Sequence, residues 1–119
     1  MYRIAFYRTA RGESPVEEFL NALPEKHQRK IAGFLELLEE HGPALMRPYA
    51  DHVRGPLREL RVPFGRHAYR VFHFIAAGDR VVLLHAFAKK TPDLPAREIA
   101  TAEGRMKDWL ERLARGEIA

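Results

Sequence analysis

Apolar and polar residues alternate at the start of the chain, in the segment YRIAFYRT at residues 2–9. Tyr2, Ile4 and Phe6 would share one face of an extended chain, and the segment is rich in aromatic and branched residues. This two-residue period is typical of a β-strand, in which successive side chains point to opposite faces of the sheet. We therefore predict a first strand over 2–9 and expect it to lie inside the sheet.

A helical period replaces the alternation after this strand. Ser14, Pro15 and Glu17 have the order of a capping box, because a serine can cap, a proline suits the first helical position and a glutamate follows three residues after the cap. A short helix is predicted to begin there.

A second helix follows Pro24 and is predicted to run to His41, where Gly42 is the stop signal. The two helices are expected to form a hairpin. Residues 42–56 contain three prolines and two glycines without a sustained period, so they are interpreted as a long surface loop. The apolar stripe of the second helix consists of Ile31, Phe34, Leu35 and Leu38.

Three strand patterns come next, at about 57–62, 67–76 and 80–90. The connection AAGDR is a turn signal, which makes the last two strands an antiparallel hairpin. The segment RVVLLHAFA is almost continuously apolar, as expected of a central strand that is buried on both faces.

A C-terminal helix is predicted after the segment TPDLP, with Pro95 near its first turn and Trp109 beside its apolar face. The resulting order is β-α-α-β-β-β-α. It predicts one α+β domain over residues 1–119, with a small and mostly antiparallel sheet, a helical hairpin and a C-terminal helix. The apolar face of the last helix consists of Ile99, Ala102, Met106, Leu110 and Leu113.

Composition restricts the class of protein. With 46% hydrophobic and 30% charged residues, the chain has the balance of a soluble globular domain and not of a disordered one. It contains no cysteine, so disulfides, thiolate metal ligands and cysteine nucleophiles are excluded. No signal-peptide pattern or apolar run of about 18 residues is present. We therefore expect a cytoplasmic protein with no membrane partner.

The net charge of +4 is concentrated in the middle of the chain. Residues 54–90 hold eight basic and two acidic side chains, a balance of +6, whereas the other residues hold twelve basic and fourteen acidic ones, a balance of −2. If the fold keeps these residues together, they form a basic patch suited to nucleic acid; a solvated basic surface without a partner is the alternative.

Arg70 is unusual because it lies within the apolar segment YRVFHF. A guanidinium in such a strand cannot be neutralised and needs an anion. Glu59 could supply it as a cross-strand ion pair, whereas a phosphate group would make Arg70 functional. Strand alternation is expected to place Glu59, Arg61, Arg70 and Lys90 on one surface of the sheet, with Lys89 and His85 on the reverse face or at the rim.

The segments LRELRV, YRVFHF and LLHAFAKKTPDLP, placed between a helical hairpin and a C-terminal helix, resemble the RelE/ParE toxin superfamily, most closely its phage-derived, HigB-like branch. The resemblance covers essentially the whole chain. It implies a bacterial type II toxin that enters the ribosomal A site, cuts mRNA there and is held in check by an antitoxin from the same operon.

The resemblance also implies roles for individual residues. Arg70 matches the arginine that contacts the scissile phosphate, Arg61 and Lys90 match basic positions of the same site, and Glu59 falls at the position of a base or a lysine. The tyrosine that some RelE proteins place after the last strand has no counterpart here. The remaining residues that we expect to contact RNA or the ribosome are Arg54, Arg58, Arg66, Lys89, His73 and His85.

Attack of a ribose 2′-OH on the adjacent phosphate needs a base, an acid and stabilisation of a doubly charged phosphorane, and it needs no metal. Glu59 is the candidate base, and His73 or His85 is the candidate acid, because histidine titrates near ~6.5. The structural interpretation of both histidines is hydrogen-bonded packing in the sheet, with His73 expected to be the more exposed. No spacing typical of metal ligands occurs, so no metal or other cofactor is expected.

Two functional alternatives stay open. A ParE-like gyrase inhibitor would bind a protein and would not need the phosphate cluster. A non-catalytic RNA-binding or regulatory module would keep the basic patch without cleaving RNA. The toxin interpretation predicts three partners, namely the ribosome, mRNA and an antitoxin of the helix-turn-helix type encoded by the adjacent gene.

Overall fold

The computed structural model describes residues 1–118 and has an α+β fold, as predicted. In this part of the chain, five strands form one sheet in the order β1-β5-β4-β3-β2, and only β1 and β5 are parallel neighbours. The strands are β1 (Arg3–Phe6), β2 (Ala50–Arg54), β3 (Leu57–Phe64), β4 (His67–Ala76) and β5 (Arg80–Ala88). The α-helices are α1 (Pro15–Asn21), α2 (Glu25–His41) and α3 (Ala96–Ala114).

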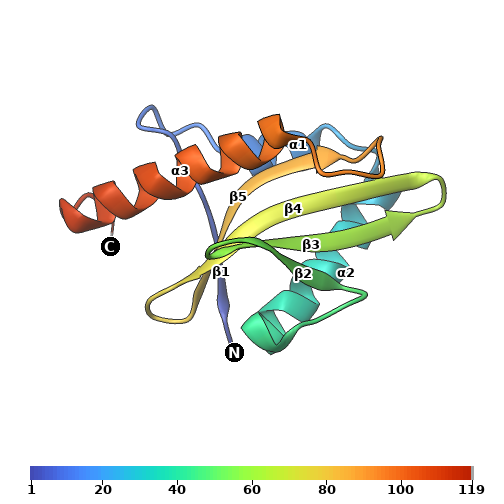
Figure 1. The fold of residues 1–119 in the computed structure, drawn as a ribbon, viewed down its shortest axis with the longest axis horizontal. Helices are drawn as coiled ribbons and strands as arrows, with labels where there is room; N and C mark the ends of the chain where they lie inside the picture. The colour runs from blue at the N-terminus through green and yellow to red at the C-terminus, as the bar shows by residue number, and fades with distance from the viewer. Residues whose placement is uncertain (119) are drawn as a thin grey trace.

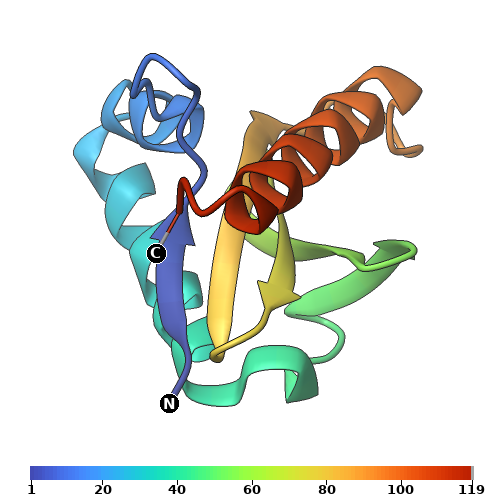
Figure 2. The ribbon, with the colours of Figure 1, turned by 90° about the vertical axis from the view of Figure 1, so that its left-hand side faces the viewer.

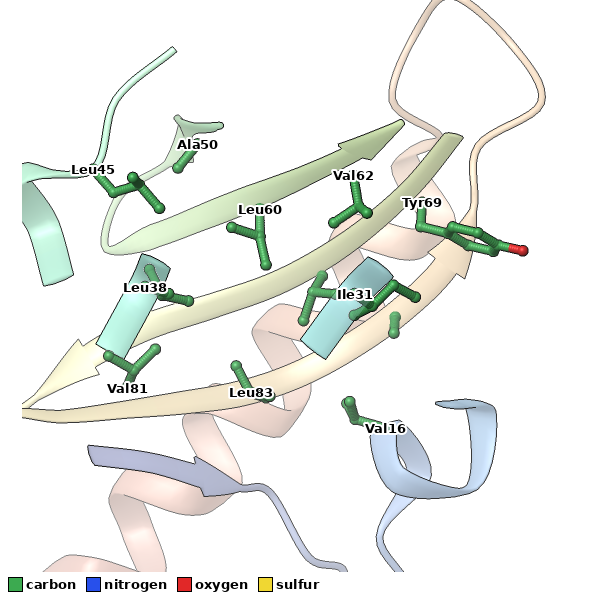
Figure 3. Close-up of a cluster of buried hydrophobic side chains, with 12 residues drawn as sticks. Val16, Ile31, Leu38, Leu45, Ala50, Leu60, Val62, Tyr69, Val81 and Leu83 are labelled. Carbon is green, nitrogen blue, oxygen red and sulfur yellow. The ribbon is translucent and has the colours of Figure 1, made fainter. Parts of the chain in front are cut away.

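The helices cover both faces of the sheet. Figures 1 and 2 show α1 and α2 on one side and α3 crossing the other. Apolar side chains of α1 and α2, among them Val16, Ile31 and Leu38, pack on one sheet face, which Figure 3 shows in close-up. On the other face Ala102 and Trp109 of α3 pack on β4 and β5. Any side chain of the sheet can therefore be assigned to the α2 face or the α3 face.

The first strand is shorter than predicted, and its predicted place in the interior of the sheet is wrong. β1 ends at Phe6 and lies at the edge, paired only with β5. Alternation reports that one face of a strand is buried, but it carries no information on how many neighbours the strand has. Beyond the strand, Tyr7 still bonds to β5 through its backbone, and its side chain packs on the α3 face.

The segment 42–56 is not only a loop, because it contains a short 3₁₀-helix (Gly42–Ala44) and the edge strand β2. β2 pairs with β3 across a turn in which Gly55 has a positive φ of 55°. The register shifts between His52 and Arg54. This bulge interrupts the side-chain alternation, which explains why the two-residue period could not be detected.

The central hairpin agrees with the prediction. β4 and β5 are antiparallel neighbours inside the sheet, and β5 is buried along most of its length. A second bulge occurs here, because Phe72 pairs with His85 while His73 pairs with Leu83. Leu84 is the extra residue, and the bulge determines where the next side chain of β5 points.

The helix boundaries agree with the signals, but two details differ. α1 begins at Pro15 after Ser14, yet the Ser14 hydroxyl forms no capping bond, and Glu17 instead accepts a bond of 3.0 Å from Arg8. In α3, Leu110 is 44% exposed and does not belong to the buried face. Among residues 1–118 no helix is both long enough and apolar enough to span a bilayer.

Candidate anion site on the sheet

Two arginines lie directly opposite each other on neighbouring strands. The β3–β4 register pairs Arg61 with Arg70, and Glu59 lies two residues before Arg61 on the same face of β3. Glu59 is paired with Phe72, which packs in the core beneath α3, so all three charged residues point to the α3 face. The predicted convergence of Glu59, Arg61 and Arg70 is confirmed.

Arg70 and Glu59 form a nearly buried ion pair. The Nε atom of Arg70 lies 2.5 Å from Oε1 of Glu59, and the two side chains are 10% and 9% exposed. The guanidinium of Arg70 also donates from Nη1 to the carbonyl of Tyr69 at 3.2 Å. Burial lowers the pKa of Arg70, Glu59 opposes that effect and Arg61 adds to it. A guanidinium nevertheless stays protonated at neutral pH.

Arg61 has no carboxylate of its own. Its half-buried side chain forms no hydrogen bond or ion pair with any residue that the structure describes. The nearest acid on β2, Asp51, is bound to Arg47 at 2.7 Å. Two opposed guanidinium groups therefore share the carboxylate of Glu59, and their excess positive charge can attract an anion such as phosphate.

His85 lies on the same sheet face as Arg70, whereas it was expected on the reverse face or at the rim of the sheet. The bulge pairs it with Phe72, and its ring stacks on Phe87 at 5.5 Å. From α3, Arg105 donates to its Nδ1 at 3.2 Å, and its Nε2–H donates to Glu98 at 2.9 Å. Because arginine only donates, this geometry assigns the proton of the neutral ring to Nε2.

Of the two lysines after β5, Lys90 does not converge with Arg70 as predicted. Ala88 and Ala86, which lie two and four residues before Lys90, pack on the α2 face, opposite to Arg70. Lys90 follows the end of β5 and is exposed, and no side-chain contact of it is found within residues 1–118. Lys89 donates to the carbonyls of the following loop, including that of Pro92 at 2.7 Å, so its ammonium organises this loop.

His73 cannot contact RNA in this fold. It is fully buried on the α2 face, where its Nδ1–H donates to the Val71 carbonyl at 3.1 Å. The expectation that it is the more exposed of the two histidines is wrong, because β4 is the middle strand of the sheet. Arg58 is its neighbour on β3 and donates to the Leu45 carbonyl at 2.9 Å, so Arg58 also lies away from Arg70.

The basic segment 54–90 is therefore not a single patch. Arg54 forms an ion pair with Glu103 of α3, and Arg66 lies exposed in the turn between β3 and β4. Strand alternation and helix contacts distribute the charges over both faces and the ends of the sheet. Only Arg61 and Arg70 remain as a pair of neighbouring cations on one surface.

The sequence of residues 18–107 matches the family described as phage-derived protein Gp49-like (DUF891). The chain belongs to this Gp49-like family. This is a RelE-like toxin family, so the resemblance is confirmed at that level, whereas the finer HigB assignment stays a prediction. A comparison with curated protein sequences found no match.

Sequence reasoning missed the part of the Gp49-like site that α3 contributes. Glu98 and Arg105 enclose His85, and Arg105 also donates to the carbonyl of the bulge residue Leu84 at 2.9 Å. An acidic residue in the first turn of a helix is favourable, so the position of Glu98 in α3 is understandable from the sequence. Nothing in the sequence indicates that its partner is His85. Burial lowers the pKa of Arg105, which stays a cation like Arg70.

A hollow of about 300 Å³ in the Gp49-like structure lies elsewhere, between α1 and α2. The site on the α3 face consists of the half-buried Arg61 beside the nearly buried ion pair of Arg70 and Glu59. Within residues 1–118 no three metal-binding side chains cluster. The groups that this site offers are cations for an anionic ligand.

Proposed function

We propose that this protein is the toxin of a type II toxin-antitoxin system and acts as a ribosome-dependent mRNA endoribonuclease. Family membership supports a toxin, and the opposed guanidinium groups of Arg61 and Arg70 with a single shared carboxylate support a phosphate ligand. The latter observation carries the proposal, because binding and stabilising a phosphate is what cleavage of RNA requires. The place of action would be the cytoplasm, where ribosomes translate.

The proposed reaction is attack of the ribose 2′-oxygen on the adjacent phosphorus. A bond forms between O2′ and phosphorus, the bond from phosphorus to O5′ breaks, and the products carry a 2′,3′-cyclic phosphate and a 5′-hydroxyl. The phosphorane formed on the way is doubly negative. Arg61 and Arg70 would stabilise this charge, with Lys90 as a further candidate if the loop after β5 brings it to the RNA.

Glu59 is the candidate base. In the free protein its carboxylate neutralises Arg70 at 2.5 Å. A phosphate that binds Arg70 would compete for the same guanidinium, which would free one carboxylate oxygen to accept the 2′-OH proton.

The leaving O5′ needs a proton, and the other titratable groups near Arg70 are occupied. His85 is held by Glu98 and Arg105, and Asp51 is held by Arg47. This supports a mechanism in which the ribosome aligns the message and helps protonate the leaving group. Free RNA would then be a poor substrate.

The test is the mapping of 5′ ends on ribosome-bound mRNA after expression of the protein and of its variants. We expect new 5′-hydroxyl ends within translated codons, insensitive to chelator, and at least a hundredfold less cleavage with Arg70→Ala. Arg61→Ala should be milder, and Arg11→Ala, which removes an exposed arginine from another loop, should leave cleavage unchanged.

Each alternative predicts a different result in the same cells. Intact message with broken DNA would establish a gyrase inhibitor, and intact message with intact DNA would leave an RNA-binding or regulatory module. If folded Arg70→Ala cuts as well as the parent protein, the proposed site is wrong. Circular dichroism of the purified variants separates loss of the site from loss of the fold.

The proposed antitoxin is a helix-turn-helix protein encoded beside this gene. A toxin that cleaves mRNA would harm the cell that makes it, so a partner protein must cover its basic site or prevent the toxin from entering the ribosome. Co-expression of the adjacent reading frame should restore growth and give a complex that co-purifies. A neighbouring protein that neither binds nor restores growth would contradict this pairing.

A further inference from the structure

Four aromatic rings gather at the end of the β3–β4 hairpin, on the sheet face opposite to Arg70. The register places Phe64 directly across from His67, and a tight turn of Gly65 and Arg66 joins them. Tyr69, two residues further along β4, points to the same α2 face and is buried there. The fourth ring belongs to His27 in the first turn of α2.

His27 contacts the three other rings. Its centroid lies 4.5 Å from that of Phe64, 4.7 Å from that of His67 and 5.8 Å from that of Tyr69. The planes of His67 and Tyr69 differ by only 4° at a separation of 6.0 Å. His27 meets the rings of His67 and Tyr69 edge-on, at 72° and 76°. The four rings, called the stack below, reach from the core to the surface, with Tyr69 at the buried end and the exposed His67 at the outer end.

Hydrogen bonding fixes the inner part of this stack and leaves its outer part free. The Tyr69 hydroxyl and Nδ1 of His27 lie 2.6 Å apart, which holds the His27 ring in place. Within residues 1–118, neither ring nitrogen of His67 nor Nε2 of His27 has a hydrogen-bond partner. Two imidazoles therefore present unused polar edges beside exposed aromatic surface.

The charges around the stack are positive. Arg66 in the turn and Lys26 beside His27 are exposed, and neither forms an ion pair with a residue that the structure describes. The first acidic residue of α2, Glu25, is bound to Arg29 at 2.5 Å. Aromatic faces next to unpaired cations suit a ligand that carries flat rings on an anionic backbone.

Core packing explains the buried rings of this cluster but not the exposed residues at its outer end. Tyr69 and the inner face of His27 fill the space between α2 and the sheet, as buried aromatic residues commonly do. An exposed His67 and an exposed Arg66 contribute little to such a core. Their position at the outer end of a pre-aligned stack is what a binding platform needs, because rigid rings lose little entropy when a ligand stacks on them.

We propose that the tip of the β3–β4 hairpin binds single-stranded RNA, with a base stacking on His67 and Phe64 and the phosphates contacting Arg66 and Lys26. Duplex RNA would bind less well, because its bases are stacked on each other and unavailable. This platform shares its partner with the proposed function but lies on the other sheet face from Arg70. It requires no cleavage and can be tested without ribosomes.

The test measures fluorescence anisotropy of a labelled single-stranded oligoribonucleotide of about ten nucleotides at about 50 mM salt, where phosphate contacts are strong. We expect the wild-type protein to bind, and His67→Ala to weaken binding about fivefold or more. His67→Phe should retain binding, because stacking needs a ring and not an imidazole nitrogen. Arg66→Ala should weaken binding and reduce its dependence on salt.

Matched controls separate this platform from general attraction to a basic protein. His41→Ala and Arg11→Ala remove an exposed histidine and an exposed arginine elsewhere and should bind like the wild type. The effect of His67→Ala should disappear when the same RNA is annealed to its complement. The proposal is overturned if the wild type does not bind the single strand, or if His67→Ala binds it unchanged. Failure of ribosome-dependent cleavage, by contrast, would leave this binding result intact.

Discussion

The buried histidine of β4 should make the protein sensitive to acid. His73 is fully inaccessible to solvent, and its Nε2 has no hydrogen-bond partner among the described residues. Burial lowers the pKa of His73 to about 4, the bond to the Val71 carbonyl opposes this effect, and positive Arg58 on β3 adds to it. The folded protein therefore holds this side chain neutral at a pH where the unfolded chain already protonates it.

The size and direction of the effect follow from that pKa. A fall from 6.5 in the unfolded chain to about 4 in the folded protein corresponds to at most ~3 kcal/mol, at about 1.4 kcal/mol for each pKa unit. Because the folded pKa is the lower one, this stability is present above pH ~6.5 and is lost as the pH falls toward 4. Between pH 7 and pH 5 the loss should be about 2 kcal/mol.

Urea unfolding at pH 7 and pH 5 measures this loss directly. His73→Leu should lose about 2 kcal/mol less than the wild type over this interval, whatever its stability at pH 7. His41→Gln, which changes an exposed histidine, should lose as much as the wild type. Equal losses in the wild type and His73→Leu would refute a buried neutral His73, and a His73→Gln variant would test the same point if the leucine variant does not fold.

Three further changes test the charged contacts. Glu59→Gln leaves Arg70 buried without its countercharge and should cost about 3 kcal/mol in urea unfolding; sulfate, which can replace the lost anion, should raise the melting temperature of this variant more than that of the wild type. Arg105→Ala removes two hydrogen bonds from α3 to β5, so it should lower the free energy of unfolding by about 2 kcal/mol and speed amide hydrogen exchange in β5. Lys107→Ala, which changes an exposed residue of the same helix, should have neither effect. Tyr7→Phe removes the hydrogen bond of 2.7 Å from the Tyr7 hydroxyl to Asp108 of α3 and should cost about 1 kcal/mol in urea unfolding. In the wild type, burial and then the bound Asp108 raise the pKa of the Tyr7 phenol, so this phenol should ionise at a higher pH than a free tyrosine in an absorbance titration.

The fold was predictable where one local signal decides the structure. Gly42 ends α2 where the sequence places its stop, and the turn around Gly78 produces the β4–β5 hairpin. Prediction failed where pairing decides. β2 pairs with β3 through backbone hydrogen bonds across a bulge, and β1 pairs only with β5. Neither kind of pairing can be recognised from the period of apolar side chains.

The candidate site divides in the same way. Arg70 was found because a cation in an apolar strand needs an anion nearby, and that requirement is readable from one segment. The face of His85 was not readable, because a single extra residue, Leu84, reverses the alternation of β5 at that point. The contacts of Glu98 and Arg105 depend on how α3 crosses the sheet, which no local pattern encodes.

This division bears on the chemistry that the protein could perform by itself. The cations of the site are set by strand register and are present in the free protein. Arg61 forms no hydrogen bond or ion pair within the described chain, and Arg70 has Glu59 as its one ion-pair partner there. The acid and base groups are different, because Glu59 is bound to Arg70 and His85 is held by two residues of α3. A site with more cations than countercharges and with occupied proton carriers binds a phosphate more readily than it cleaves one. If RNA cleavage occurs here, an external partner must align the ribose and change at least one of these contacts, and the ribosome is the partner that the proposed function provides.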